Sequence, residues 1–193
     1  LSPSGVGTQT NYMIQALLKT GKFKFTCLGG AVKHQNYTPL KVSPWEEDWL
    51  IYPVDGYGNQ DMIRSVLRQT RPDMLWFMTD PRFWDWLWDL EDEIRPHIPM
   101  VYYHVWDNYP YPDFNQSYYE SNDLIVSISK LTSDIVQNVA PDVKEIYLPH
   151  AVDNNIFCKQ DQSIVNQFIE ENFAHHNMDE KFVFFWNSRN AKR

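Results

Sequence analysis

The sequence predicts an α/β fold, with a Rossmann-like, mostly parallel sheet that carries helices on both faces. Short apolar segments typical of strands alternate with amphipathic helical segments from residue 8 onward. Strands that are joined through helices run parallel, because each crossover returns the chain to the same edge of the sheet. Ligands of such sheets bind beyond the carboxyl ends of the strands, so the residues that follow each strand are the candidates for function.

The predicted elements begin with a helix. Apolar residues at three- and four-residue spacing predict a helix over residues 8–20, which ends at Gly21. Residues 22–28 alternate in polarity and predict a strand, and the apolar segment 49–54 predicts another. Residues 31–48 show no clear period, so we expect a loop with room for one short strand.

The middle of the chain shows the clearest alternation. An amphipathic segment predicts a helix over residues 60–69, and the continuous apolar run 74–78 predicts a strand covered on both faces. Asp80 and Pro81 suit the N-cap and first position of a helix, which we expect over residues 81–95. By the same criteria we expect strands at 100–106, 124–128, 144–148 and 181–186, and helices at 113–121, 129–139 and 161–173.

Composition excludes several classes of protein. The 193 residues carry a formal net charge of −8, which argues against a nucleic-acid-binding surface. No apolar run is long enough for a transmembrane helix, although a peripheral membrane contact is left open. Cys27 and Cys158 lack metal-type or redox-type spacing, which predicts free thiols and a cytoplasmic location. The six histidines are scattered and predict no metal site, and P-loop and serine-nucleophile motifs are missing.

Candidate site residues occur at the chain start and after the strands. Gly5, Val6 and Gly7 precede the first helix, where a glycine turn and free N–H groups suit a phosphate, and Ser4 or Thr8 can cap that helix. Taken alone, such a short glycine pair is better explained as a loop followed by a capped helix. The other candidates follow predicted strands, and each has a structural explanation as a cap, a packed side chain, a rigid surface loop or a solvated tail: Thr79, Asp80, His104, Trp106, Asp107, Asn108, Tyr109, Arg189 and Lys192.

Five segments, taken in order, resemble the N-terminal half of a GT-B glycosyltransferase, closest to the retaining family 4 enzymes. They are the glycine turn at residues 5–7, Arg71-Pro72-Asp73 with the apolar strand after it, Val101–Pro110, Leu148–Asp153 with Phe157, and Phe184–Arg193. The resemblance implies an enzyme that transfers a hexosyl-type sugar from a nucleotide-diphosphate-sugar donor to a carbohydrate or glycosylated acceptor, with retention. It implies no cofactor and no essential metal.

The resemblance also implies roles for single residues. Gly5, Val6, Gly7, Arg189 and Lys192 would bind the donor diphosphate. His104 and Asp107 would be catalytic. An acceptor or sugar pocket would include Thr79, Asp80, Trp106, Asn108, Tyr109 and His150.

Three positions depart from the family pattern. Trp106 stands where the family has histidine, and His104 is the candidate to replace it from the same strand face. Ala151 replaces a glycine, and the family's phosphate-binding lysine would fall just past Arg193, so Lys192 matches it only approximately.

The sequence predicts that this chain is a piece of a longer protein. Residues 1–180 would form an acceptor-side domain whose first strand is missing, and residues 181–193 would begin a truncated nucleotide-sugar-binding domain. We therefore expect no transferase activity from this chain alone. The alternatives are a non-catalytic carbohydrate- or nucleotide-binding module of the same fold, and a nucleotide-sugar epimerase or other dinucleotide enzyme.

Overall fold

The computed structural model describes residues 4–30, 34–106, 108–176, 181, 182, 184 and 186. The chain divides into two compact units, Leu1–Ala151 and Val152–Arg193, and each is described by itself. The domain boundary predicted near residue 181 lies within the second unit.

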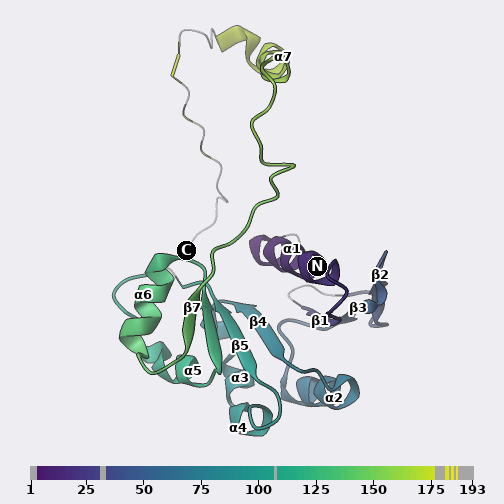
Figure 1. The fold of residues 1–193 in the computed structure, drawn as a ribbon, viewed down its shortest axis with the longest axis vertical. Coiled ribbons are helices and arrows are strands. Elements are labelled where there is room, and N and C mark those ends of the chain that lie inside the picture. Colours follow the sequence, from purple (N-terminus) through teal and green to yellow (C-terminus); the bar gives the residue numbers. More distant parts are fainter. Residues whose placement is uncertain are drawn as a thin grey trace. The chain divides into compact units, whose positions relative to one another are not determined.

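A four-stranded parallel sheet forms the centre of the first unit (Figure 1). Its strands are β4 (Leu75–Thr79), β5 (Met100–His104), β6 (Leu124–Ser127) and β7 (Glu145–Tyr147), which pair in that order. All five residues of β5 are buried, as expected of a strand covered on both faces. The predicted α/β class with a parallel sheet is therefore confirmed, and the arrangement is compatible with a Rossmann-like fold.

A second sheet of three strands belongs to the same unit. β1 (Phe25–Gly29) pairs in parallel with β3 (Glu46–Pro53), and β2 (Leu40–Val42) pairs antiparallel on the other side of β3. The loop expected at residues 31–48 thus contains β2 and the first residues of β3. Cys27 on β1 is a free thiol whose pKa is raised to about 11 by burial, and Cys158 is also free.

Caps on three helices follow the residue types of the sequence. α1 (Gly5–Leu18) begins at Ser4, α2 (Gln60–Thr70) at Asn59 and α6 (Lys130–Val139) at Ser129. Each capping side chain accepts a hydrogen bond from the backbone N–H three residues later. Of the two caps expected for the first helix, Ser4 is the one used.

The start of α1 corrects the sequence-based prediction. Gly5, Val6 and Gly7 form the first helical turn and not a loop before residue 8. The Ser4 Oγ accepts from the Gly7 N–H at 3.1 Å, which starts the helix three residues earlier than expected.

The helix expected at residues 81–95 is also wrong, because three short pieces replace it. They are η1 (Pro81–Phe83), α3 (Asp85–Trp88) and α4 (Glu91–Ile94). Trp84 and Leu90 have φ values of −121° and −105° and separate the pieces. Both side chains belong to or pack against the main core, so tertiary packing overrides the helical pattern here.

Apolar side chains cover both faces of the parallel sheet. Phe77, Tyr102 and Ile125 face the larger core, where they meet α6 and the short helices after β4. The opposite face carries Met78, Tyr103 and Val126, against which Val6 of α1 packs. Farther along α1, Ile14 and Leu18 pack on the three-stranded sheet around Trp49.

The second unit contains α7 (Gln162–Phe173), which confirms the helix expected at 161–173, and η3 (Ala174–His176). None of the residues of α7 is buried, and Phe168 is 56% exposed. The described residues of the predicted strand 181–186 show no strand pairing. Among the described residues, no helix is both long enough and apolar enough to cross a membrane.

The cap of α6 can be tested by substitution. We expect Ser129→Ala to lower the free energy of unfolding by about 1 kcal/mol, because the Thr132 N–H loses its acceptor. Chemical denaturation measures the change. Ser65→Ala, at an exposed interior position of α2, is the matched control and should not destabilise the protein. An equal effect of the two substitutions would contradict the capping role.

Candidate functional site

One row of residues crosses the carboxyl edge of the parallel sheet. Thr79, His104, Ser127 and Tyr147 are partners in register and end β4, β5, β6 and β7. Partners in register on parallel strands present their side chains to the same face. The structure therefore brings two predicted site residues, Thr79 and His104, together. Ser127, which was not predicted to belong to the site, lies beside them.

His104 is completely buried in this row. Its Nε2 lies 2.9 Å from the Tyr119 hydroxyl, which also accepts a hydrogen bond from Asn115 Nδ2 at 3.4 Å. The hydroxyl then donates to Nε2, and the imidazole proton is assigned to Nδ1. Burial lowers the pKa of His104 to about 3, so the ring is neutral and weakly basic at neutral pH. Because the side chain of His104 has no exposed surface, it does not contact solvent at the carboxyl edge of the sheet.

Two buried atoms at the ends of β5 and β6 have no hydrogen-bond partner in the part of the chain that the structure describes. They are Nδ1 of His104 and Oγ of Ser127, and both residues have zero exposure. An unsatisfied buried polar group costs about 1–3 kcal/mol. Both atoms are therefore sites that a bound water or a polar group of a ligand can satisfy.

Thr79 and Asp80 end β4 in a constrained turn. Thr79 has a φ of +121°, a region that a β-branched residue rarely adopts, and its carbonyl oxygen accepts from the Tyr102 hydroxyl at 2.6 Å. Such strain is concentrated at functional sites. The Asp80 carboxylate accepts a hydrogen bond from the backbone N–H of Arg82 and forms an ion pair with the guanidinium of Arg82. The predicted capping role of Asp80 is therefore confirmed.

The segment after β5 carries four aromatic side chains, which we name the aromatic loop: Trp106, Tyr109, Tyr111 and Phe114. Trp106 is half-buried and packs against the main core, and the other three are exposed. Tyr109 and Phe114 are 59% and 72% exposed. Tyr109 and Tyr111 both donate to Asp134 Oδ2, at 3.4 and 2.8 Å, and the second bond raises the pKa of Tyr111 to about 12. The Trp106 indole N–H donates to the carbonyl oxygen of Asn108, whose side chain is exposed.

The first turn of α1 lies close to the turn after β7. Gln9 bonds to both backbone groups of Ala151: its Nε2 donates to the carbonyl oxygen at 2.7 Å, and its Oε1 accepts from the N–H at 3.1 Å. His150 packs edge-to-face on Tyr103, at 5.5 Å between ring centroids, and desolvation lowers the pKa of His150. Val6 packs on the cluster that contains Tyr103, so the glycine turn and His150 lie at the same edge of the sheet.

The opening of α1 offers unpaired backbone donors. As the first two helical residues, Gly5 and Val6 have no intrahelical acceptor for their N–H groups. A Cβ atom added at Gly5 would have no atom within 4 Å, so space adjoins the backbone there. Asp107, Arg189 and Lys192 lie outside the described residues, and their roles remain predictions.

Sequence reasoning missed four residues of this edge: Ser127, Tyr119, Asp134 and Gln9. Ser127 could have been recognised, because it ends a predicted apolar strand. In the structure it is the partner of His104 on the neighbouring strand. The other three act through contacts between distant segments, for which the sequence offers no local signal.

In the described portion of the chain, no three His, Cys, Asp or Glu side chains are placed to hold a metal ion. Comparison with protein-family models, with curated proteins and with solved structures finds no match to this chain.

Burial of His104 predicts a pH-dependent stability. The unfolded chain protonates this residue near pH 6.5, whereas the folded protein does so only near pH 3. The contribution of the neutral ring to the free energy of unfolding is therefore complete above pH 6.5. It is lost as the pH falls toward 3, by up to about 1.4 kcal/mol per pH unit. We expect His104→Gln to reduce this slope in denaturation series between pH 6.5 and 4. His97 is exposed, so His97→Gln should reduce the dependence of the unfolding free energy on pH less than His104→Gln does. Identical slopes for the two variants would contradict the assignment of this pH dependence to His104.

Proposed function

We propose that the chain is the acceptor-side domain of a glycosyltransferase, which moves a sugar from a nucleotide-diphosphate-sugar donor to an acceptor with retention. The observation that carries the proposal is the position of the first turn of α1 at the carboxyl edge of the parallel sheet, beside the turn after β7. Parallel sheets bind their ligands at this edge. The five segments that resemble the family support the same function.

The donor side of the proposal rests on the opening of α1. The N–H groups of Gly5 and Val6 and the positive end of the helix dipole attract an anion such as a diphosphate. Without a side chain at Gly5, phosphate oxygens can approach the backbone closely. Arg189 and Lys192 are proposed to supply positive charge to the leaving diphosphate.

The acceptor side rests on the aromatic loop. Exposed rings offer flat apolar surfaces, and their polar groups can hydrogen-bond to the hydroxyls of a sugar. Because Asp134 accepts from both Tyr109 and Tyr111, the two rings are held 5.3 Å apart without burial. A carbohydrate acceptor fits this combination of rings, an exposed amide at Asn108 and a carboxylate.

The second candidate is a carbohydrate- or nucleotide-binding module without catalysis. The burial of His104 and its low pKa favour it, because this ring does not reach the surface and is a weak base at neutral pH. Under the transferase proposal, Asp107 and an opened edge must then supply the catalytic contact. The two candidates differ in turnover, while both require binding at the carboxyl edge.

A bulky side chain at the start of α1 tests the donor site. In the intact protein we expect Gly5→Val to weaken binding of uridine or guanosine diphosphate by about tenfold or more, because the new methyl groups occupy the space next to the N–H groups. Titration calorimetry gives the affinity. Thr8→Val, an isosteric change at an exposed position of the same helix, is the control and should bind like the parent. Unchanged affinity in Gly5→Val would remove the α1 opening from the donor site.

A second experiment tests the acceptor site. We expect Tyr109→Ala to raise the KM for a carbohydrate acceptor about 2- to 10-fold without changing donor affinity, because one stacking surface is lost. Phe23→Ala is the control, since Phe23 is similarly exposed but lies at the amino end of β1. Equal KM values for the parent and Tyr109→Ala would argue against an acceptor on the aromatic loop.

A further inference from the structure

A second tyrosine held by a carboxylate lies on the three-stranded sheet. The Tyr37 hydroxyl donates to Asp55 Oδ1 at 2.6 Å, and Tyr37 remains 49% exposed. This bond joins the segment after β1 to the loop after β3, at the carboxyl ends of two parallel strands. His34 packs edge-to-face on the same ring, at 5.9 Å between ring centroids. The Tyr37 ring is thus fixed by its hydroxyl and one edge, while about half of the residue contacts solvent.

The aromatic loop on the four-stranded sheet has the same arrangement. There Tyr109 and Tyr111 donate to Asp134 Oδ2 and remain exposed. Hydrogen bonds to a carboxylate, and not burial, therefore hold the tyrosines of both places. A ring that is fixed before binding loses little conformational freedom when a ligand covers it. Both places are suited to bind a ligand through a ring face and a carboxylate together.

The two tyrosine–carboxylate pairs lie at the same edge of the first unit. Tyr57, in the loop after β3, stacks on Phe83 after β4 at 4.2 Å between ring centroids. Gln60 Nε2 donates to the carbonyl oxygen of Trp86 at 3.3 Å. The carboxyl ends of β3 and β4 thus lie together, and β1 and β5 are parallel to β3 and β4 respectively. The segments that carry the two pairs therefore emerge at one edge.

The composition of these segments suits a neutral ligand that is rich in hydroxyl groups. Residues 34–39, 54–59 and 108–114 combine aromatic, amide and hydroxyl side chains and contain no lysine or arginine. Anionic ligands are usually held by such cations. The hydroxyls of a sugar can donate to carboxylates and amide oxygens, and its ring can cover an aromatic face. The chemistry therefore favours a carbohydrate over a nucleotide or an acidic peptide.

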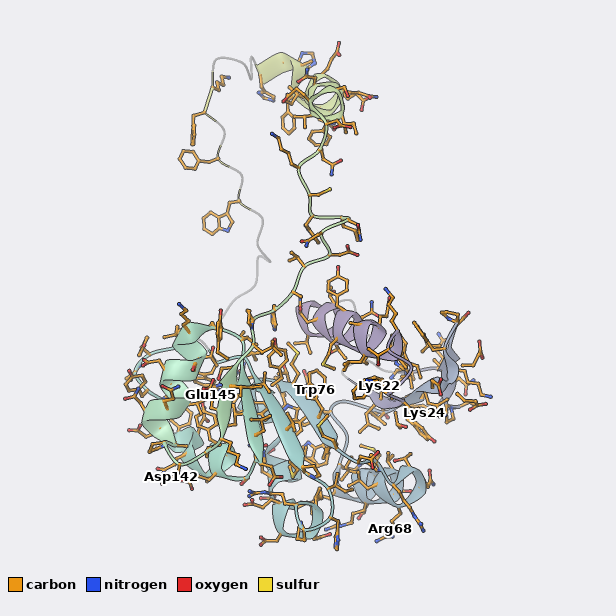
Figure 2. All side chains as sticks on the ribbon, in the orientation of Figure 1. Lys22, Lys24, Arg68, Trp76, Asp142 and Glu145 are labelled. Atoms are coloured by element: carbon orange, nitrogen blue, oxygen red, sulfur yellow. The ribbon has the colours of Figure 1, made fainter. Side chains whose placement is uncertain are left out.

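Basic side chains on the neighbouring elements do not change this conclusion. Arg82, which follows β4, forms an ion pair with Asp80 at 2.9 Å. Arg68, which Figure 2 labels, lies in the last turn of α2, and this helix leads back to the amino end of β4. Lys130 begins α6 one turn before Asp134, whose carboxylate offsets its charge.

A single sugar cannot contact both pairs. The first pair belongs to β1 and β3 and the second to β5 and α6, and β4 lies between β1 and β5 (Figure 1). Strands are spaced about 4.8 Å apart, which separates the two pairs by about 10 Å or more. A pyranose ring is about as large as one tyrosine ring. Several linked sugars are therefore needed to reach from one pair to the other.

From these observations we propose that the acceptor is an oligosaccharide or polysaccharide, which binds Tyr37 and Asp55 as well as the aromatic loop. The inference rests on the transferase function proposed above, which leaves the length of the acceptor open. The aromatic loop holds the sugar that receives the transferred group. The Tyr37–Asp55 pair holds a sugar farther along the same chain, so it contributes to the affinity for long acceptors.

Binding of glycans of increasing length tests the proposal. The probes are linear α-1,4- and β-1,4-glucans and mannans of one to six residues, presented on an array to the intact protein. We expect binding to increase with length, and Tyr37→Ala to weaken binding of the six-residue glycans about 2- to 10-fold more than binding of single sugars, because one ring face is lost. Tyr37→Phe removes only the hydroxyl and should have a smaller effect. Phe23→Ala is the control, since Phe23 is 44% exposed but precedes the amino end of β1.

Three results overturn the proposal. They are the absence of binding to every glycan, an affinity that does not increase with length, and equal binding of the six-residue glycans by the parent and Tyr37→Ala. Calorimetry with uridine and guanosine diphosphate separates this failure from a failure of the transferase function. A protein that binds a diphosphate but shows no preference for long glycans retains the transferase proposal and loses this one. Length-dependent binding through Tyr37 without diphosphate binding supports the glycan site in a module that lacks catalysis.

Discussion

The parallel pairing of β5 with both neighbours is the constraint on which the rest of the first unit depends. Every residue of β5 is buried. The backbone groups of this strand therefore hydrogen-bond to β4 and β6, and its side chains pack into one of two layers on the faces of the sheet. This strand sets the register that brings Thr79 and Ser127 to either side of His104. The candidate site is thus a result of strand alignment, and a shift by one residue would move His104 to the opposite face.

Polar groups are placed at this edge at a cost to stability. The positive φ of Thr79 and the unpartnered atoms of His104 and Ser127 all lie at the ends of neighbouring strands. Elsewhere in the unit, Trp88 Nε1 donates to Asn122 Oδ1 at 3.2 Å, whereas the buried Nε1 atoms of Trp49 and Trp84 also lack a partner among the described residues. What distinguishes this row is that a strained backbone at Thr79 lies beside two unpartnered polar atoms on adjacent strands, and such strain often occurs at functional sites.

Much of the fold could be predicted from local signals. Continuous apolar runs located β4, β5 and β6, and Pro81 and Ser129 located the starts of η1 and α6. Residues 81–95 could not be predicted in this way, because Trp84 leaves the helical conformation to pack on Phe77, a contact invisible in the periodicity. At the site, the sequence identified His104 and Thr79 through their positions after strands. It did not reveal that Tyr119 would bury His104 or that Asp134 would hold two tyrosines, since both contacts join segments that are distant in sequence.

The double hydrogen bond between Gln9 and Ala151 has a consequence for the order of folding. The two residues are 142 positions apart, so at ribosomal rates of about 5–20 residues per second the partner of Gln9 is made roughly 7–28 s after it. The first turn of α1 contains two glycines, which are poor helix formers, and cannot rely on intrinsic propensity during that interval. The opening of α1 is therefore expected to acquire its final geometry only when β7 and the turn after it have been synthesised, which makes the candidate donor site one of the last parts of the unit to form.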